Sequence, residues 1–288
     1  MSFFGTAARA ARRAPRPLLD FALERLLLRW GFFRHPARRR VILGNYRRIL
    51  AFAGRDPGEA EAVLERSIPL YARLLISMLS RPEDEEFARG IEAGKLLSAV
   101  AAARARGRGV VVALSNFGFF AHALMVLFQH EVPMRIPVLR RASLLHLPHG
   151  WADSFLSVGD ASRECLAALK RNEAAVILTM VNYMARRPTL ELFGAPARLG
   201  YAPAALALSA GAPILPAFTV FEDGKCRIEV EPLLQPEGSV SELTGRLARI
   251  QERWIGRYPH LWHVYEDFWS PAKMDASYRF VRRYLQIF

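Results

Sequence analysis

The chain has 288 residues, of which 52% are hydrophobic and 23% are charged, and its mean hydropathy is +0.09. This balance fits a large soluble-type domain and excludes both a disordered chain and a protein made of many membrane spans. Cys165 and Cys226 cannot build a disulfide scaffold, and the sequence holds neither a CxxC pair nor a zinc-ligand pattern. We therefore expect a reducing compartment and no metal centre.

The net charge of +13 is concentrated near the N-terminus. Residues 1–48 hold twelve arginines against Asp20 and Glu24, a local charge of +10. Residues 17–33 are too short and too charged to span a bilayer, but at helical spacing their apolar residues form one stripe. The members of this stripe are Leu19, Ala22, Leu23, Leu26, Leu27, Trp30 and Phe33. Such a stripe flanked by arginines is typical of a helix at an anionic membrane surface. The alternative is a helix docked on the protein's own body, with its arginines in solvent.

Nucleic acid is the other polyanion that a basic arm can bind. Here the aromatic residues of the arm lie on a helical stripe and not as stacking platforms, and the remaining 240 residues carry only +3. We therefore predict a membrane-associating arm over residues 1–40, no nucleic-acid partner, and a single α/β domain over residues 41–288.

The predicted elements begin with helices, which extend to about residue 105. Asp56 and Glu59 have capping-box spacing ahead of a long apolar helix that contains Pro69. A continuous β-branched run, 109–114, predicts a strand buried on both faces, and 135–139 and 174–180 are two further short apolar runs. Helices are predicted at 121–130 and 161–171.

The second half of the chain continues the alternation. An apolar helix is predicted at 201–211, and two strands, 213–222 and 226–234, are joined by the hairpin signal Asp223-Gly224. Ser239 and Glu242 have capping-box spacing at the start of a last long helix, which ends near residue 257. Short buried strands alternating with helices predict an α/β fold, with a mostly parallel central sheet flanked by helices and a helical N-terminal extension.

The junction after the first buried strand carries a resemblance. The run GRGVVVALSNFGFFA (107–121) resembles the GxGVIxxxxHFGNWE block of the lysophospholipid acyltransferase superfamily, and in particular of the late acyltransferases of lipid A biosynthesis. The run LFGAPARLGYAPAALALSAGAPILPAF (192–218) resembles two later blocks, and RYPHLW (257–262) resembles the closing R-x-P-x-x-W. The order and spacing of the blocks, over roughly residues 38–269, make the resemblance specific.

The resemblance implies a fold, an activity and a location. It implies an acyltransferase-like α/β domain that transfers a fatty acyl chain from an acyl thioester, carried by acyl carrier protein or CoA, to a lipid or other hydroxyl or amine acceptor. It further implies a peripheral protein on the cytoplasmic side of the inner membrane, with no cofactor beyond the thioester co-substrate.

The sequence departs from the family at the catalytic pair. In the HxxxxD/E motif the histidine takes the proton of the acceptor and the acid orients its ring. Asn116 and Ala121 stand at these two positions, and an amide cannot accept a proton at neutral pH. The chain is therefore either an enzyme with its base elsewhere or a catalytically inactive relative that binds lipid or acyl chains. His122 is the nearest candidate base, its alternative being a buried helix residue, and Asn116 can still donate a hydrogen bond to a carbonyl.

Further site residues follow from the same blocks. Phe117 and Gly118 belong to the first block, and Phe193, Gly194 and Pro216 to the later ones, so the resemblance implies substrate contacts for all five. Arg140 and Arg141 close the second strand, where paired guanidinium groups suit an acceptor phosphate, and solvated loop charges are the alternative. His146, His149 and Asp153 are spaced too loosely to predict a metal site.

Overall fold

A computed structural model of the chain describes residues 33–79, 90–138, 152–179 and 189–270, together with Phe21, Glu24 and Arg25. Most of the arm and the predicted pair Arg140 and Arg141 lie outside the described residues.

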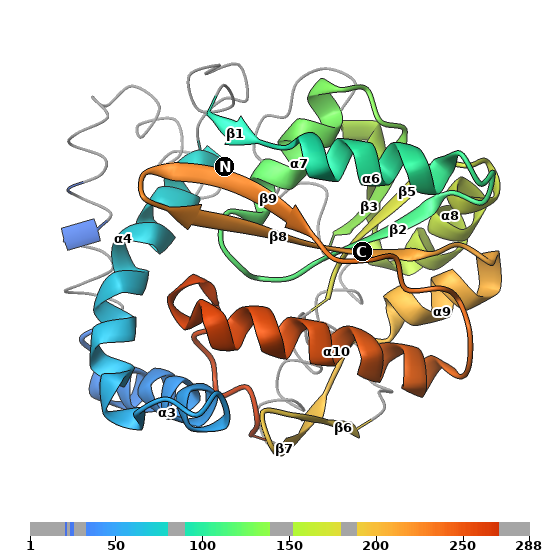
Figure 1. Cartoon of the computed structure of the whole chain (residues 1–288). Helices are drawn as coiled ribbons and strands as arrows, with labels where there is room; N and C mark the ends of the chain where they lie inside the picture. Colours follow the sequence, from blue (N-terminus) through green and yellow to red (C-terminus); the bar gives the residue numbers. More distant parts are fainter. Residues whose placement is uncertain are drawn as a thin grey trace.

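The centre of the molecule is a seven-stranded sheet (Figure 1). Its strands are β1 (Ile91–Glu92), β2 (Val110–Leu114), β3 (Met134–Val138), β4 (Phe155–Ser157), β5 (Ala174–Leu178), β8 (Ile214–Glu222) and β9 (Lys225–Val230). They are arranged in the order β1-β9-β8-β2-β5-β3-β4. Every neighbouring pair is parallel except β8 and β9, which form an antiparallel hairpin. The predicted mostly parallel sheet is confirmed.

Strand β2 lies near the middle of this sheet and is buried at all five positions. Val110, Val112 and Leu114 pack on one face, together with α6 (Gly94–Arg104) and α7 (Phe120–Gln129). Val111 and Ala113 pack on the opposite face. That face is covered by α8 (Val158–Lys170), α9 (Ala202–Ala210) and α10 (Val240–Arg257). Figure 1 shows α9 and α10 on the other side of the sheet from α6 and α7. A strand covered on both faces needs apolar residues at every position, which explains the unbroken VVVAL run.

The N-terminal helices form a third layer at one end of the sheet. Helix α3 (Pro36–Phe52) and helix α4 (Ala60–Leu79) share a hydrophobic cluster with the C-terminal half of α10 and with the short helix η5 (Pro259–Leu261). The Asn45 side chain of α3 donates a hydrogen bond to the Glu266 carbonyl over 2.7 Å, which ties the segment after η5 to this layer. Phe33, the last member of the predicted apolar stripe, is 1% exposed and packs edge-on against Tyr265.

A small hairpin lies outside the central sheet. Strands β6 (Thr189–Leu192) and β7 (Ala195–Arg198) pair antiparallel, and their two turn residues, Phe193 and Gly194, both have positive φ. The hairpin packs against α10 and shares its hydrophobic cluster. These two strands were not predicted from the sequence, and neither were the short edge strands β1 and β4.

Of the two capping boxes predicted at helix N-termini, the one at Ser239 is confirmed and the one at Asp56 is not. Ser239 and Glu242 form the complete capping box, with side-chain bonds in both directions. The box predicted at Asp56 is wrong in detail, because Asp56 Oδ1 accepts from the Gly58 N–H over 2.8 Å at a short 3-10 turn, η2 (Pro57–Glu59). Glu59 pairs instead with Arg55. Within the described ranges, no helix has both the length and the apolar character that a bilayer span requires.

Candidate active site

The candidate site is the turn that follows β2, residues 115–118. The Phe117 N–H donates to the Ser115 carbonyl over 2.7 Å, which makes a tight turn centred on Asn116. Gly118 has a φ of 54°, and a Cβ at this position would lie 1.7 Å from the carbonyl oxygen of Thr219 in β8. Only glycine combines this backbone conformation with so close an approach.

The carboxyl end of β2 is fixed by buried polar contacts. The Leu114 carbonyl accepts hydrogen bonds from the Thr179 N–H over 2.7 Å and from Thr179 Oγ1 over 2.9 Å. Thr179 Oγ1 in turn accepts a hydrogen bond from the side-chain amide of Gln251 in α10. These bonds connect β2, β5 and α10 directly behind the turn, so its position is set by three elements.

The turn is also paired with the segment that follows η5. Phe117 and Trp262 form an antiparallel bridge, flanked by bonds from the Gly118 N–H to the Leu261 carbonyl (2.7 Å) and from the His263 N–H to the Asn116 carbonyl (2.8 Å). This register places His263 directly opposite Asn116. The first and the last blocks of the sequence resemblance are thus joined backbone to backbone.

The two residues proposed for catalysis from the sequence have different surroundings. Asn116 is half-buried at the turn. His122 lies in the first turn of α7, is 0% exposed, and has its ring centroid 5.1 Å from that of Phe119. Burial lowers the pKa of His122 to about 4, because the charged imidazolium loses its solvation. Ala121, at the family's acid position, is half-buried beside it.

A second histidine, not predicted from the sequence, is bonded to the turn through its backbone N–H. His263 is 9% exposed, and its Nδ1 lies 3.0 Å from the Tyr265 hydroxyl, which lies 2.8 Å from Ser67 Oγ of α4. Burial, and secondarily His260, lower the pKa of His263 to about 3, while the Gly118 backbone offsets part of this shift. The sequence feature that could have identified His263 is its position directly after the closing R-x-P-x-x-W block.

Buried polar atoms without a hydrogen-bond partner gather around the same turn. In the described part of the chain they include Ser115 Oγ, Thr219 Oγ1, Trp262 Nε1 and His263 Nε2. Each belongs to the turn or to a residue on a segment that touches it. Buried polar groups in folded proteins are nearly always bonded, so these atoms are exceptions that the described residues leave unsatisfied.

Of the other predicted substrate contacts, Phe193 is connected to the turn, whereas Pro216 lies inside the sheet. Phe193 is 2% exposed, its ring centroid lies 6.5 Å from that of Trp262, and its N–H donates to Glu252 Oε1 over 2.5 Å. Gly194 follows it in the hairpin turn. Pro216 is buried inside the sheet opposite Ala113 and is not part of the turn. The structure thus connects Phe193 to the turn through Trp262.

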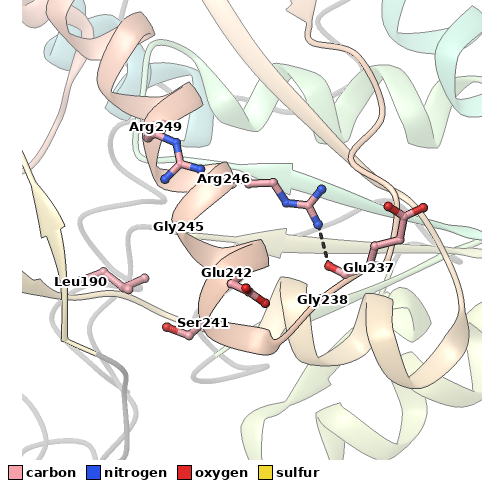
Figure 2. Close-up of a pocket in the computed structure, with 8 residues that line it drawn as sticks. All are labelled: Leu190, Glu237, Gly238, Ser241, Glu242, Gly245, Arg246 and Arg249. Atoms are coloured by element: carbon pink, nitrogen blue, oxygen red, sulfur yellow. Dashed lines mark hydrogen bonds between the residues drawn. The ribbon is translucent and has the colours of Figure 1, made fainter.

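Two shallow depressions lie along α10 and away from the turn. The first has a volume of about 560 Å³, and Figure 2 shows it at the start of α10, where the Arg246 guanidinium donates to the Glu237 carbonyl over 2.7 Å. The second, of about 610 Å³, lies between Phe52 of α3 and the arginines of α10. No residue of 115–122 lines either depression, so neither of them includes the candidate turn.

Comparison with known proteins identifies the same family whose sequence blocks form the turn. The bacterial lipid A biosynthesis acyltransferase family matches residues 4–270, and the chain belongs to this family. Two curated relatives, the phosphatidylinositol mannoside acyltransferases of Mycobacterium tuberculosis strains ATCC 25618 / H37Rv and CDC 1551 / Oshkosh, are each 30% identical over 189 residues. The alignment covers 62% of this chain and 60% of each relative's length.

Proposed function

We propose that the protein is an acyltransferase that moves a fatty acyl chain from an acyl thioester, carried by acyl carrier protein or CoA, to a hydroxyl or amine group of a lipid acceptor. Membership of the lipid A acyltransferase family supports this proposal. The observation that carries it is the bonded pairing of the turn at Asn116 with the closing segment at His263, because two separate family blocks meet there at a strand end. Ligands of open α/β sheets bind at such ends.

Asn116 has a role in this proposal that does not require proton transfer. Its side-chain amide donates a hydrogen bond to the thioester carbonyl oxygen and stabilises the negative charge that develops there as the acceptor attacks. The half-buried position of Asn116 suits a group that touches substrate while being shielded from bulk water. Phe117, Gly118, Phe193 and Gly194 are proposed as substrate contacts on the strength of the family blocks, and Arg140 and Arg141, which lie outside the described residues, are proposed to bind an acceptor phosphate.

The second candidate function is a non-catalytic relative that binds lipid or acyl chains. The observation in its favour is that Asn116 and Ala121 replace the base and the acid of the family's dyad. The two functions predict the same fold and the same ligands, and they differ only in whether a thioester is consumed.

We further propose that the protein works as a peripheral protein on the cytoplasmic face of the inner membrane. The arm, residues 1–40, would hold the single α/β domain of residues 41–288 against anionic lipid. Its support is the local charge of +10 over residues 1–48 next to an apolar stripe. Phe33 of that stripe packs on the protein's own body, so membrane insertion is assigned to the residues before it.

The decisive experiment follows the acyl group and the thiol together. The purified full chain is first analysed by mass spectrometry for co-purified lipid. It is then incubated with palmitoyl-CoA or palmitoylated acyl carrier protein and with vesicles that contain phosphatidylinositol mannoside, the lipid named in its relatives, or the co-purified lipid. Release of free thiol matched by acylated lipid supports the acyltransferase. Bound lipid with no thiol release above a protein-free control, for both donors, would support the non-catalytic relative.

A further inference from the structure

We propose that His263 supplies the imidazole that the family motif has lost at Asn116, and acts as the general base of acyl transfer. The proposal rests on the function proposed above and names the residue that takes the acceptor's proton. It does not restore the family's HxxxxD/E pair, because the base comes from a different segment of the chain.

The turn at Asn116 and the closing segment at His263 pair in a defined register. Residues directly opposite in an antiparallel pair project to the same face, with their Cβ atoms about 5 Å apart. The bridge between Phe117 and Trp262, with the His263 N–H bonded to the Asn116 carbonyl, sets Asn116 opposite His263. The Gly118 backbone also contributes to the pKa of His263, so the imidazole lies against the turn. The backbone of His263 thus lies beside the position where the family has its histidine, and its ring interacts with the backbone of the same turn.

The Tyr265 hydroxyl orients the imidazole ring of His263. Nδ1 is held by the Tyr265 hydroxyl at 3.0 Å, and that hydroxyl is held by Ser67 Oγ at 2.8 Å. When Nδ1 donates to Tyr265 and Tyr265 donates to Ser67, Nε2 carries the free electron pair. Nε2 is buried and forms no hydrogen bond of full geometry among the described residues, and the Gly118 backbone, which raises the pKa of His263, lies near the ring. A base oriented by a second group through one ring nitrogen is the usual arrangement of catalytic histidines.

The surroundings of the His263 ring determine its protonation state. The groups packed around the ring are Tyr71 and Tyr265, with His260 next to it in the chain and Arg66 Nη2 3.4 Å from His260 Nε2. None of these carries a negative charge at neutral pH. The ring of His263 is therefore neutral at that pH, with one ring nitrogen unprotonated.

The proton balance of the step follows from this. The acceptor oxygen forms a bond to the thioester carbonyl carbon while its proton passes to His263 Nε2. The carbon–sulfur bond then breaks, and the leaving thiolate takes the proton from the imidazolium, which yields an ester, a free thiol and the neutral ring. A thiol has a pKa of about 8.5, well above that of the buried imidazole, so the proton moves on to sulfur and the ring is regenerated.

The test compares His263→Gln with two matched variants. His260→Gln changes a buried histidine of the same segment that does not face Asn116, and His122→Gln changes the candidate base named from the sequence. We expect His263→Gln to lower kcat for thiol release from palmitoyl-CoA by about a hundredfold or more with KM little changed, and the His260→Gln control to stay within about threefold, while His122→Gln tests the competing candidate base. Added imidazole should restore part of the rate in His263→Ala.

The pH profile gives an independent readout. With His263 as base, kcat/KM of the wild type should show no ascending limb between about pH 5 and 8, whereas a base with an ordinary histidine pKa would give one near about pH 6.5. Tyr265→Phe keeps the ring but removes the orienting hydroxyl, so kcat should fall by about tenfold without a matching change in KM. This variant decides the question if His263→Gln does not fold.

The outcomes separate the two proposals. A wild type that releases no thiol from either donor overturns the proposed function and this inference together. A transfer rate within about threefold of wild type in folded His263→Gln, or in Tyr265→Phe if the former is unfolded, overturns only the assignment of His263. A loss confined to His122→Gln would move the base to α7.

Discussion

The carbonyl oxygen of Thr219 in β8 lies only 1.7 Å from the position that a Cβ of Gly118 would occupy. Gly118 also has a φ of 54°, in the left-handed region. The turn at Asn116 is therefore pressed against the neighbouring strand at a point where no side chain fits. The turn can approach β8 this closely because Gly118 has no Cβ.

We expect Gly118→Ala to lower the free energy of unfolding by about 3 kcal/mol or more, because the new methyl group must displace backbone. Gly54→Ala is the matched control, since Gly54 has a φ of 70° with no atom within 4 Å of its added Cβ. It should cost only about 1 kcal/mol. Urea unfolding of both variants measures the difference, and equal losses would show that the contact with Thr219 is not limiting.

Asn116→Ala should lower kcat for acyl transfer by about a hundredfold and leave KM little changed, as expected for loss of one donor to the developing oxyanion. The thermal unfolding midpoint should move little, because the Asn116 contact in the bridge is made by its backbone carbonyl. Steady-state thiol release beside a melting curve tests this. A kcat within about threefold of wild type would remove the Asn116 side chain from the chemistry.

Rebuilding the family motif gives a separate prediction. Asn116→His with Ala121→Glu restores the two groups of the HxxxxD/E dyad at positions that are both half-buried. We expect the double variant to show a new ascending limb in its rate profile near about pH 6.5, where an imidazole with an ordinary pKa loses its proton. A profile identical to that of the wild type would mean that the turn no longer presents these positions to substrate.

Stability should fall on acidification. Burial lowers the pKa of His122 and of His260 to about 4, with Arg66 and Arg55 adding to the shift of His260, and lowers that of His263 to about 3. Unfolded histidine has a pKa of about 6.5, so below that pH the unfolded chain binds more protons than the folded one. The stability is present above about pH 6.5 and is lost as the pH falls towards the folded values.

Each of these histidines contributes at most about 1.4 kcal/mol per pH unit in that window. Urea unfolding at about pH 7 and about pH 5.5 should therefore show a steep loss, and His263→Gln should reduce the pH slope by about a third. The contrary result, equal slopes in the variant and the wild type, would mean that His263 is not buried in its neutral form.

The arm should bind anionic membranes through charge and insertion together. Leu23→Glu with Trp30→Glu leaves every arginine in place, yet should release the protein from anionic vesicles, as should deletion of residues 1–32. Each arginine near such a surface is worth about 1 kcal/mol, so wild-type binding should also weaken with salt. Vesicle sedimentation beside a thermal melt checks this, with neutral vesicles and duplex DNA as comparison ligands.

Phe33→Ala separates the two interpretations of the stripe. Because Phe33 packs on Tyr265, its truncation should lower the free energy of unfolding by about 3 kcal/mol and leave vesicle binding intact. If the variant with Leu23→Glu and Trp30→Glu binds anionic vesicles as the wild type does, the arm is not a membrane anchor.

Several elements were predictable because their signals are local. The β-branched run of β2, the Asp223-Gly224 turn between β8 and β9, and the Ser239 capping box each depend on residues within a few positions of one another. The hairpin β6–β7 was not predictable in this way. Its turn puts Phe193, a bulky residue, at a positive φ, and the contacts that hold it come from Glu252 and Trp262, far along the chain.

The sequence by itself determined the family, the α/β fold and the loss of the catalytic pair at Asn116 and Ala121, since block order, hydrophobic period and residue chemistry are properties of the linear chain. Only the tertiary structure decided what faces the altered turn. His263 comes opposite Asn116 because the closing segment pairs antiparallel with the turn while α3 and α4 hold that segment from behind. Such a pairing is set by packing among elements distant in sequence, so the closing block next to His263 marks the segment but does not predict that it faces Asn116.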